Sequence, residues 1–135
     1  MTPISTRRRA RRTLMAATVW AAAALLPAAA RAHHGWSWAE DAQSELSGTV
    51  QQVQVAPPHP WLDVKTAQGV VWRVDLGNPT QTERSGFTQN SAQLGDNVTV
   101  IGNRDKDQTR QRMKAVQITV QGKPYVMYPE RLEKR

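Results

Sequence analysis

The sequence of 135 residues contains no cysteine, one phenylalanine and two tyrosines. The absence of cysteine excludes disulfides, thiolate metal sites and cysteine nucleophiles. Stability must therefore come from the hydrophobic core, and any metal ion must be bound through nitrogen, oxygen or thioether ligands. The sequence also lacks the motifs of serine hydrolases, zinc proteases, P-loop proteins and dinucleotide-binding enzymes. We therefore predict a protein that is not an enzyme, with no catalytic residue.

A concentrated basic surface is missing as well, although the net charge is +7, from 18 basic and 11 acidic residues. Six arginines lie within residues 1–32, where there is no acidic residue, so residues 33–135 carry 12 basic and 11 acidic side chains. Nucleic-acid affinity depends mainly on basic side chains that neutralise phosphates. Because residues 33–135 are nearly neutral, nucleic acid is not an expected partner.

What the first 32 residues do contain is the pattern of an export signal. An arginine-rich start precedes the apolar run Leu14–Ala30, and Ala30-Arg31-Ala32 fits a signal peptidase site. We predict cleavage after Ala32, with cleavage after Ala30 as the alternative. The apolar run is short for a membrane span, so no stable span is expected after cleavage. Both the Sec and the twin-arginine routes remain open, and either gives a periplasmic or secreted protein.

The rest of the chain divides into an N-terminal arm (33–45), one β-domain (46–128) and a charged tail (129–135). The arm and the tail show no lasting hydrophobic period and are predicted to be irregular. Alternating apolar residues predict the strands of the domain, and polar residues around Phe87 predict a short helical segment. The expected strands are 46–55, with a bulge between 50 and 53, 61–66 and 70–76 as a hairpin, 94–102, and 113–120 with a kink at Ala115, followed by a return over 125–128.

Five principal strands with one helical segment between the third and fourth fit an all-β fold. The expected architecture is a small Greek-key barrel like the oligonucleotide/oligosaccharide-binding (OB) fold. An immunoglobulin-like sandwich is the competing architecture, but it needs about seven strands. Alternation places the following residues in the barrel interior: Val50, Val53, Leu62, Val64, Trp72, Val74, Val98, Val100, Val116 and Ile118.

Several local motifs occur together in this chain, including Ala32-His33-His34-Gly35-Trp36, Pro58-His59-Pro60 and Gly86-Phe87-Thr88. With Leu46-x-Gly48-x-Val50 and the late Tyr128-Pro129, this set resembles an exported bacterial protein family of unknown function. The resemblance covers nearly all of residues 32–130. It implies an exported small β-domain and names no reaction, so the chemistry has to come from the side chains.

All three histidines of the sequence lie outside the expected strands, His33 and His34 at the predicted mature terminus and His59 between prolines. Cleavage after Ala32 would give His33 a free α-amino group beside its own imidazole, and the two nitrogens can chelate one ion. Cu(II) prefers such tetragonal nitrogen coordination and heads the divalent affinity series. We expect a copper site at His33, His34 and His59, with zinc as the alternative ion. The sequence does not favour a copper oxygenase.

Three tryptophans lie close to these histidines in the sequence, Trp36 and Trp38 in the arm and Trp61 after the proline loop. Aromatic side chains on a small barrel can stack against flat ligands. The same side chains can instead attach the arm to the barrel. The alternative function is therefore a binding or assembly module that recognises another envelope protein or a small ligand through these aromatic residues.

The export signal gives the first testable prediction. N-terminal sequencing of the protein purified from the bacterial envelope is expected to begin at His33, or at Arg31 if cleavage follows Ala30. Intact chains that begin at Met1 and are recovered from the cytosol would contradict it.

Overall fold

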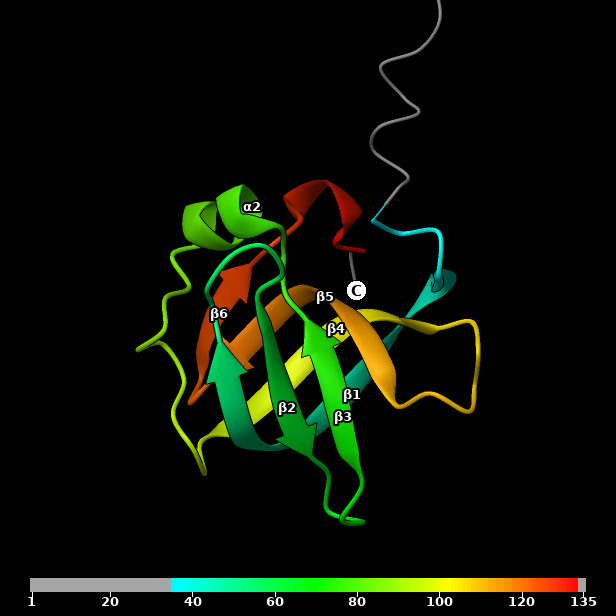
Figure 1. Cartoon of the computed structure of the whole chain (residues 1–135), viewed down its shortest axis with the longest axis horizontal. Coiled ribbons are helices and arrows are strands. Elements are labelled where there is room, and N and C mark those ends of the chain that lie inside the picture. The colour runs from blue at the N-terminus through cyan, green and yellow to red at the C-terminus, as the bar shows by residue number, and fades with distance from the viewer. Residues whose placement is uncertain (1–34, 134–135) are drawn as a thin grey trace, which may run out of the picture.

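The computed structural model describes residues 35–133, and the predicted signal segment together with His33 and His34 lies outside them. Six strands, one α-helix and one 3-10 helix make up the domain (Figure 1). Their order is β1 (Ala39–Gln54), β2 (Trp61–Lys65), β3 (Val71–Asp75), α2 (Pro79–Arg84), β4 (Asn97–Asp105), β5 (Arg112–Val120), β6 (Lys123–Val126) and η1 (Pro129–Arg131).

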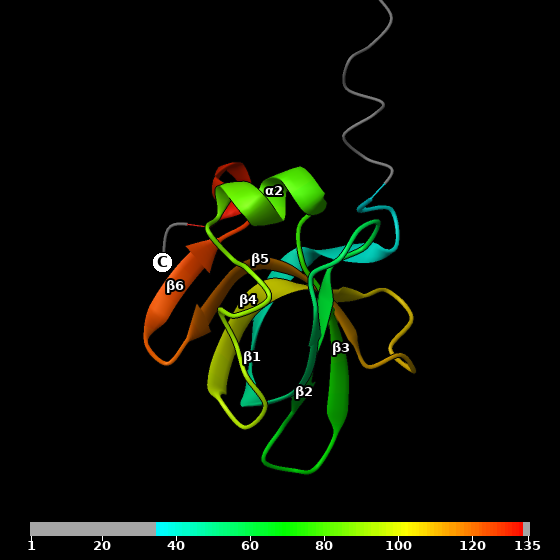
Figure 2. The same ribbon diagram turned by 60° about the vertical axis from the view of Figure 1, so that its left-hand side comes forward.

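The strands close into a ring. Antiparallel pairs join β1 to β2, β2 to β3, β1 to β4 and β4 to β5. A parallel pairing between β3 and β5 closes the barrel, and β6 adds to the free edge of β5. This topology, with one short helix between β3 and β4, confirms the predicted five-stranded OB-like barrel. Figures 1 and 2 place α2 and η1 at one end of the barrel, opposite the β2–β3 turn.

Two irregularities bend the barrel strands where the sequence predicted them. The register between β1 and β2 shifts between Val50 and Gln52, so the predicted bulge is confirmed. The register between β4 and β5 shifts opposite Ala115, where a kink was expected. A Cβ on Gly102, the partner of Ala115, would lie 2.2 Å from the Lys114 carbonyl oxygen, so only glycine fits this close approach.

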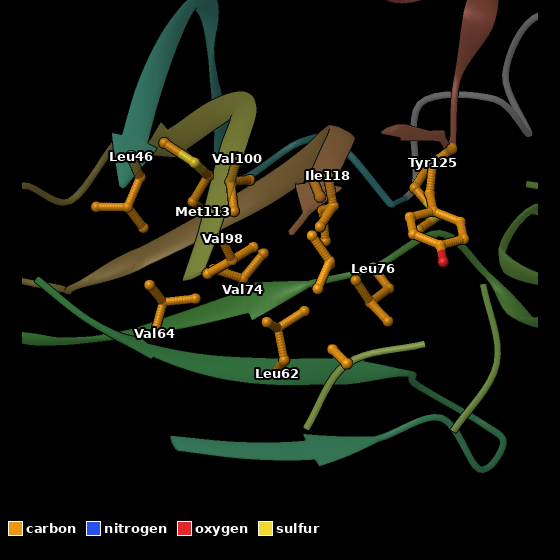
Figure 3. Close-up of a cluster of buried hydrophobic side chains, with 14 of the residues drawn as sticks. Leu46, Leu62, Val64, Val74, Leu76, Val98, Val100, Met113, Ile118 and Tyr125 are labelled. Carbon is orange, nitrogen blue, oxygen red and sulfur yellow. The ribbon is translucent and has the colours of Figure 1, made fainter. Parts of the chain in front are cut away.

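The hydrophobic core fills the ring of strands (Figure 3). Nine of the ten predicted interior residues are buried, and Val53 is half-buried at the bulge. Phe87 is buried after α2, as expected, and stacks edge-on with Tyr125 at 5.1 Å between ring centroids. The alternation of apolar residues therefore identified the inner face of the barrel correctly.

Two predicted irregular segments have a regular structure. The arm prediction is wrong for residues 39–45, because β1 begins at Ala39 and pairs with β4 as far as Asp105. Backbone pairing forms this part of the strand, and the Asn103 side-chain amide donates to the Glu40 and Asp41 carbonyl oxygens where the register shifts. Hydrophobic periodicity cannot detect a strand held in this way.

The tail also differs from the expectation. Residues 129–131 form η1, and Leu132 packs against the core. In the region from residue 35 to residue 133, no helix is both long and apolar enough to cross a membrane.

The packing of Trp72 gives the second prediction. Its side chain is 9% exposed in the core cluster, whereas the neighbouring Val71 is 47% exposed. We expect Trp72→Ala to lower the free energy of unfolding by about 3–5 kcal/mol, because it leaves a large cavity. Urea denaturation measures the change, and Val71→Ala is the surface control with a change of about 0.5 kcal/mol or less. A Trp72→Ala protein as stable as the parent would contradict this packing.

Candidate functional site

A cleft of about 910 Å³ lies where the N-terminal turn meets the barrel. Its walls come from the turn 35–38, the β1–β2 loop, the end of β3, the start of β5 and the segment around η1. The three tryptophans predicted as a ligand platform, Trp36, Trp38 and Trp61, all line it. We call this site the tryptophan cleft. The structure thus brings together three side chains that the sequence placed only near one another.

The turn that carries Trp36 and Trp38 is fixed to the barrel. The Ala39 N–H donates to the Trp36 carbonyl oxygen at 3.0 Å, and the Lys106 N–H donates to the Trp38 carbonyl oxygen at 2.9 Å. The Lys106 side chain also donates to the Ser37 carbonyl oxygen at 2.8 Å. These bonds attach the turn to the loop between β4 and β5, and so hold one wall of the cleft in place.

The opposite wall is built from the proline-rich β1–β2 loop and the segment after β3. The Leu76 N–H donates to the carbonyl oxygen of buried Pro60 at 3.0 Å, which ties the loop to the end of β3. Asn78 then caps α2, its side chain accepting from the Gln81 N–H at 2.8 Å. The Asn78 N–H donates to the Tyr128 hydroxyl at 3.3 Å, so the helix cap also fixes a side chain of the cleft.

A cation lies over the ring of each cleft tryptophan. The guanidinium carbon of Arg73 is 3.7 Å from the Trp61 ring centroid, and that of Arg112 is 3.9 Å from Trp38. Trp36 has the Arg131 guanidinium at 4.1 Å and the Lys114 ammonium at 5.7 Å. Such contacts stabilise by about 0.5–1 kcal/mol at exposed sites. Their larger effect here is to give the four cations defined positions around the cleft.

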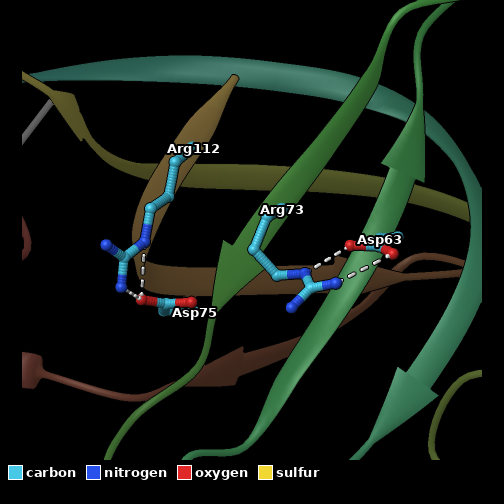
Figure 4. Close-up of polar contacts among 4 residues, drawn as sticks. All are labelled: Asp63, Arg73, Asp75 and Arg112. Atoms are coloured by element: carbon cyan, nitrogen blue, oxygen red, sulfur yellow. Dashed lines mark hydrogen bonds and ion pairs between the residues drawn. The ribbon is translucent and has the colours of Figure 1, made fainter. Parts of the chain in front are cut away.

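Two of these cations are already paired with carboxylates (Figure 4). Arg73 donates to both Asp63 oxygens, at 2.6 and 3.3 Å. Arg112 donates through two nitrogens to one Asp75 oxygen, at 3.1 and 2.5 Å. Over residues 35–133, neither Lys114 nor Arg131 forms a salt bridge. The cleft cations without a salt bridge therefore lie at its Trp36 end.

The cleft concentrates positive charge in a domain that has almost none. Residues 35–133 contain 10 basic and 11 acidic side chains. The cleft is lined by four of these basic side chains and by two acidic ones, Asp75 and Glu130. A low-dielectric cleft of one predominant sign attracts ligands of the opposite sign. The electrostatics favour an anion.

The surroundings of Lys114 in the cleft shift its pKa. In the parallel β3–β5 ladder, the backbone of Lys114 is the register partner of Asp75. Burial lowers the pKa of Lys114, Asp75 opposes that shift, and Arg112 lowers the pKa further. Burial also raises the pKa of Tyr128, which packs edge-on against Trp36 with 4.9 Å between the ring centroids. Both directions indicate that this part of the cleft disfavours charge that lacks a partner.

The predicted metal ligands are only partly described. His59 is exposed in the β1–β2 loop and lines the cleft, and so does Gly35. His33 and His34 lie outside the described residues, but His34 is bonded to Gly35. Within the described domain, His, Asp and Glu form no group of three or more that could hold a metal ion. The structure thus places His59 in the lining of the same cleft as Gly35, the residue that follows the predicted terminal histidines.

The sequence did not reveal the basic residues of the site. Arg73, Arg112, Lys114 and Arg131 come from β3, β5 and η1, and no local pattern connects them. Arg73 and Asp75 alternate with the buried Trp72 and Val74, so both charged residues lie on the outer face of β3. Their assembly with the tryptophans required the pairing of β3 with β5.

The lowered pKa of Lys114 gives the third prediction. Between that pKa and the ordinary value of 10.5, the unfolded chain holds the proton more tightly, so this group makes stability rise with pH. At pH values below the lowered pKa, the charged and partly buried amine of Lys114 reduces the free energy of unfolding. We expect Lys114→Met to be more stable than the parent at neutral pH, with the difference shrinking as the pH rises through the window.

Urea denaturation of both proteins across this pH range measures the effect. Tyr128 contributes in the opposite direction only as the pH passes its ordinary pKa of 10.0, so the comparison is made below that pH, where it stays protonated. Lys123→Met is the control, because Lys123 is exposed on β6 and lies over Tyr125 at 5.1 Å outside the cleft. A Lys114→Met protein no more stable than the parent at neutral pH would show that burial does not disfavour this charge.

Comparison with known proteins places the chain in a family. Among solved structures, the S. pombe Stn1–Ten1 complex contains a chain that is similar at 17% identity and a TM-score of 0.46. The match covers 58% of this chain and 57% of that one, so it spans less than two thirds of the other chain. No curated protein matches in sequence. Residues 21–114, more than half of the chain, match the model of a family of unknown function, and the protein therefore belongs to the DUF6152 family.

Proposed function

We propose that this is an exported, non-enzymatic protein that binds a metal ion, copper before zinc, where its mature N-terminus meets the β1–β2 loop. The observation that carries the proposal is that Gly35 and His59 both line the tryptophan cleft. A three-histidine site needs the arm to turn back toward the proline loop. The anchored turn 35–38 supports that requirement.

Covalent geometry limits how far the terminal histidines can lie from the cleft. Consecutive Cα atoms are about 3.8 Å apart, so the His33 Cα lies within about 8 Å of the Gly35 Cα. Gly35 is itself followed by a turn that is hydrogen-bonded to the barrel at Trp36 and Trp38. The α-amine and imidazole of His33, the imidazole of His34 and that of His59 are then the nitrogen ligands available to one ion.

The chemistry of these ligands favours Cu(II). An amine and imidazoles supply the tetragonal nitrogen set that Cu(II) prefers, whereas zinc would take three histidines and a water molecule in tetrahedral geometry. The free amine exists only if residues 1–32 are removed, so the metal site and export belong to one proposal. Both groups must be deprotonated, with reference pKa values of about 6.5 for imidazole and about 7.7–8.0 for the amine. Affinity should therefore fall as the medium becomes acidic.

Copper titration of the mature protein, followed by electron paramagnetic resonance, gives the fourth prediction. We expect a nitrogen-rich tetragonal signal from the protein that begins at His33. Three additional glycines before His33 should abolish that signal, because they separate the free amine from both imidazoles. His33→Ala should weaken copper binding, because it removes one nitrogen of the chelate. His59→Ala should weaken copper binding by about tenfold or more, since even loss of a group behind a metal ligand has an effect of that size.

The matched control is Gln54→Ala, which changes another exposed residue that lines the cleft without removing a nitrogen ligand. It should bind copper as the parent does. Equal binding by the native, extended and His33→Ala proteins would rule out the terminus as the site. Equal copper binding by the parent and His59→Ala would show that His59 is not a ligand of the ion.

A second function is favoured by a separate observation, the three tryptophans in one cleft. On this interpretation the tryptophan cleft recognises another envelope protein or a small ligand. The volume of about 910 Å³ lies within the range of ligand-binding clefts, about 300–1,000 Å³. Trp36 and Trp38 also attach the turn to the barrel, so the same residues serve the structure and line the cleft.

A further inference from the structure

We propose that the tryptophan cleft binds a small organic anion, with its carboxylate or phosphate head between Lys114 and Arg131. The inference rests on the second proposed function, the cleft as a ligand site, and gives that ligand a chemical class. It does not depend on copper.

The first argument is the position of the two cations. Lys114 and Arg131 both lie over the Trp36 ring, at 5.7 and 4.1 Å from its centroid. Neither of them forms a salt bridge with any side chain in residues 35–133. Both cations therefore lie at the Trp36 end of the cleft, where the charges that act on Lys114 come from Asp75 and Arg112. An oxyanion head at this point would supply a negative charge to both cations.

The second argument is the contrast with the other end of the cleft. Arg73 and Arg112 also stack on tryptophans, but each already donates two hydrogen bonds to a carboxylate of the protein. Arg131 has the same stacked arrangement without the carboxylate. Stacking fixes the plane of a guanidinium and leaves its N–H groups at the edge, where they match a planar oxyanion. The oxyanion of the ligand would accept hydrogen bonds from Arg131, as the Asp63 carboxylate does from Arg73.

The third argument is the environment of Lys114. Its ammonium is partly buried, and burial lowers its pKa. A hydrogen bond to a charged group in such a site is stronger than one in bulk water. Tyr128, which also lines the cleft, accepts a bond from the Asn78 N–H and retains its own hydroxyl proton for donation. The Trp36 end of the cleft therefore offers donors and positive charge together.

The size and lining of the cleft indicate an organic ligand. A volume of about 910 Å³ is far larger than an inorganic ion needs, and indole side chains line it. A flat apolar body can lie along these walls while its head reaches the cations. A polynucleotide would need an extended basic track, and residues 35–133 contain 10 basic against 11 acidic side chains.

The test is isothermal titration of the mature protein, freed of metal by passage over a chelating resin, with three probes. Benzoate and phenyl phosphate carry the two head groups, and benzamide is the neutral counterpart of benzoate. We expect one or both anions to bind at least about tenfold more tightly than benzamide, because only a charged head gains charge-assisted hydrogen bonds. The stronger of the two anions identifies the head group.

Variants locate the head group. Lys114→Met and Arg131→Gln should each weaken binding of the stronger anion by about tenfold. Lys123→Met and Arg104→Gln are matched controls, because Lys123 lies over Tyr125 and Arg104 over Trp72, outside the cleft. The controls should bind as the parent does, and circular dichroism verifies that all variants are folded.

Three results would overturn the proposal. Equal binding of benzamide and benzoate would show a cleft that accepts ligands without regard to charge, so the second function would stand and the anion would be wrong. Anion binding unaffected by Lys114→Met and Arg131→Gln would place the anion elsewhere. If none of the three probes binds, the proposal of an organic anion is wrong. Copper titration of the same protein would still test the metal site independently.

Discussion

The parallel pairing of β3 with β5 is the constraint on which the domain depends. It closes an otherwise open sheet into a barrel, and it is the only parallel pairing among the strands of residues 35–133. The same pairing sets Arg73 opposite Arg112 and Asp75 opposite Lys114. The pairing that closes the barrel therefore also sets the charge pattern of the cleft, because the four charged residues of this ladder line the cleft.

Most of the barrel could be predicted from the sequence because its strands bury one face. Alternation of apolar residues is a local signal, and the slip after Val50 survives in the structure as a bulge. The start of β1 left no such signal. Residues 39–45 are held by backbone pairing with β4 and by the Asn103 amide, so their side chains need not alternate. Hydrophobic patterning predicts strands that face a core, and it fails where a strand extends beyond the core.

The candidate site was predictable only as far as its ingredients lie close in sequence. Trp36, Trp38 and Trp61 flank the histidines and the proline loop, which made them a natural platform. The cations were not predictable, because a charged residue on an outer strand face usually contacts only solvent. Lys114 and Arg131 are positioned in the cleft by contact with Trp36, which lies more than seventy residues earlier in the chain. Long-range packing of this kind has no signature in a single sequence.

The anchored turn has a consequence for the proposed processing of the N-terminus. Gly35 is part of the cleft wall, so residues 1–34 are joined to the described domain at the cleft. If residues 1–32 are removed, as we propose, the new α-amine of His33 lies two residues before this wall. Under that proposal, proteolytic processing is the step that creates the chelating amine, and a precursor or an N-terminally tagged protein would lack it.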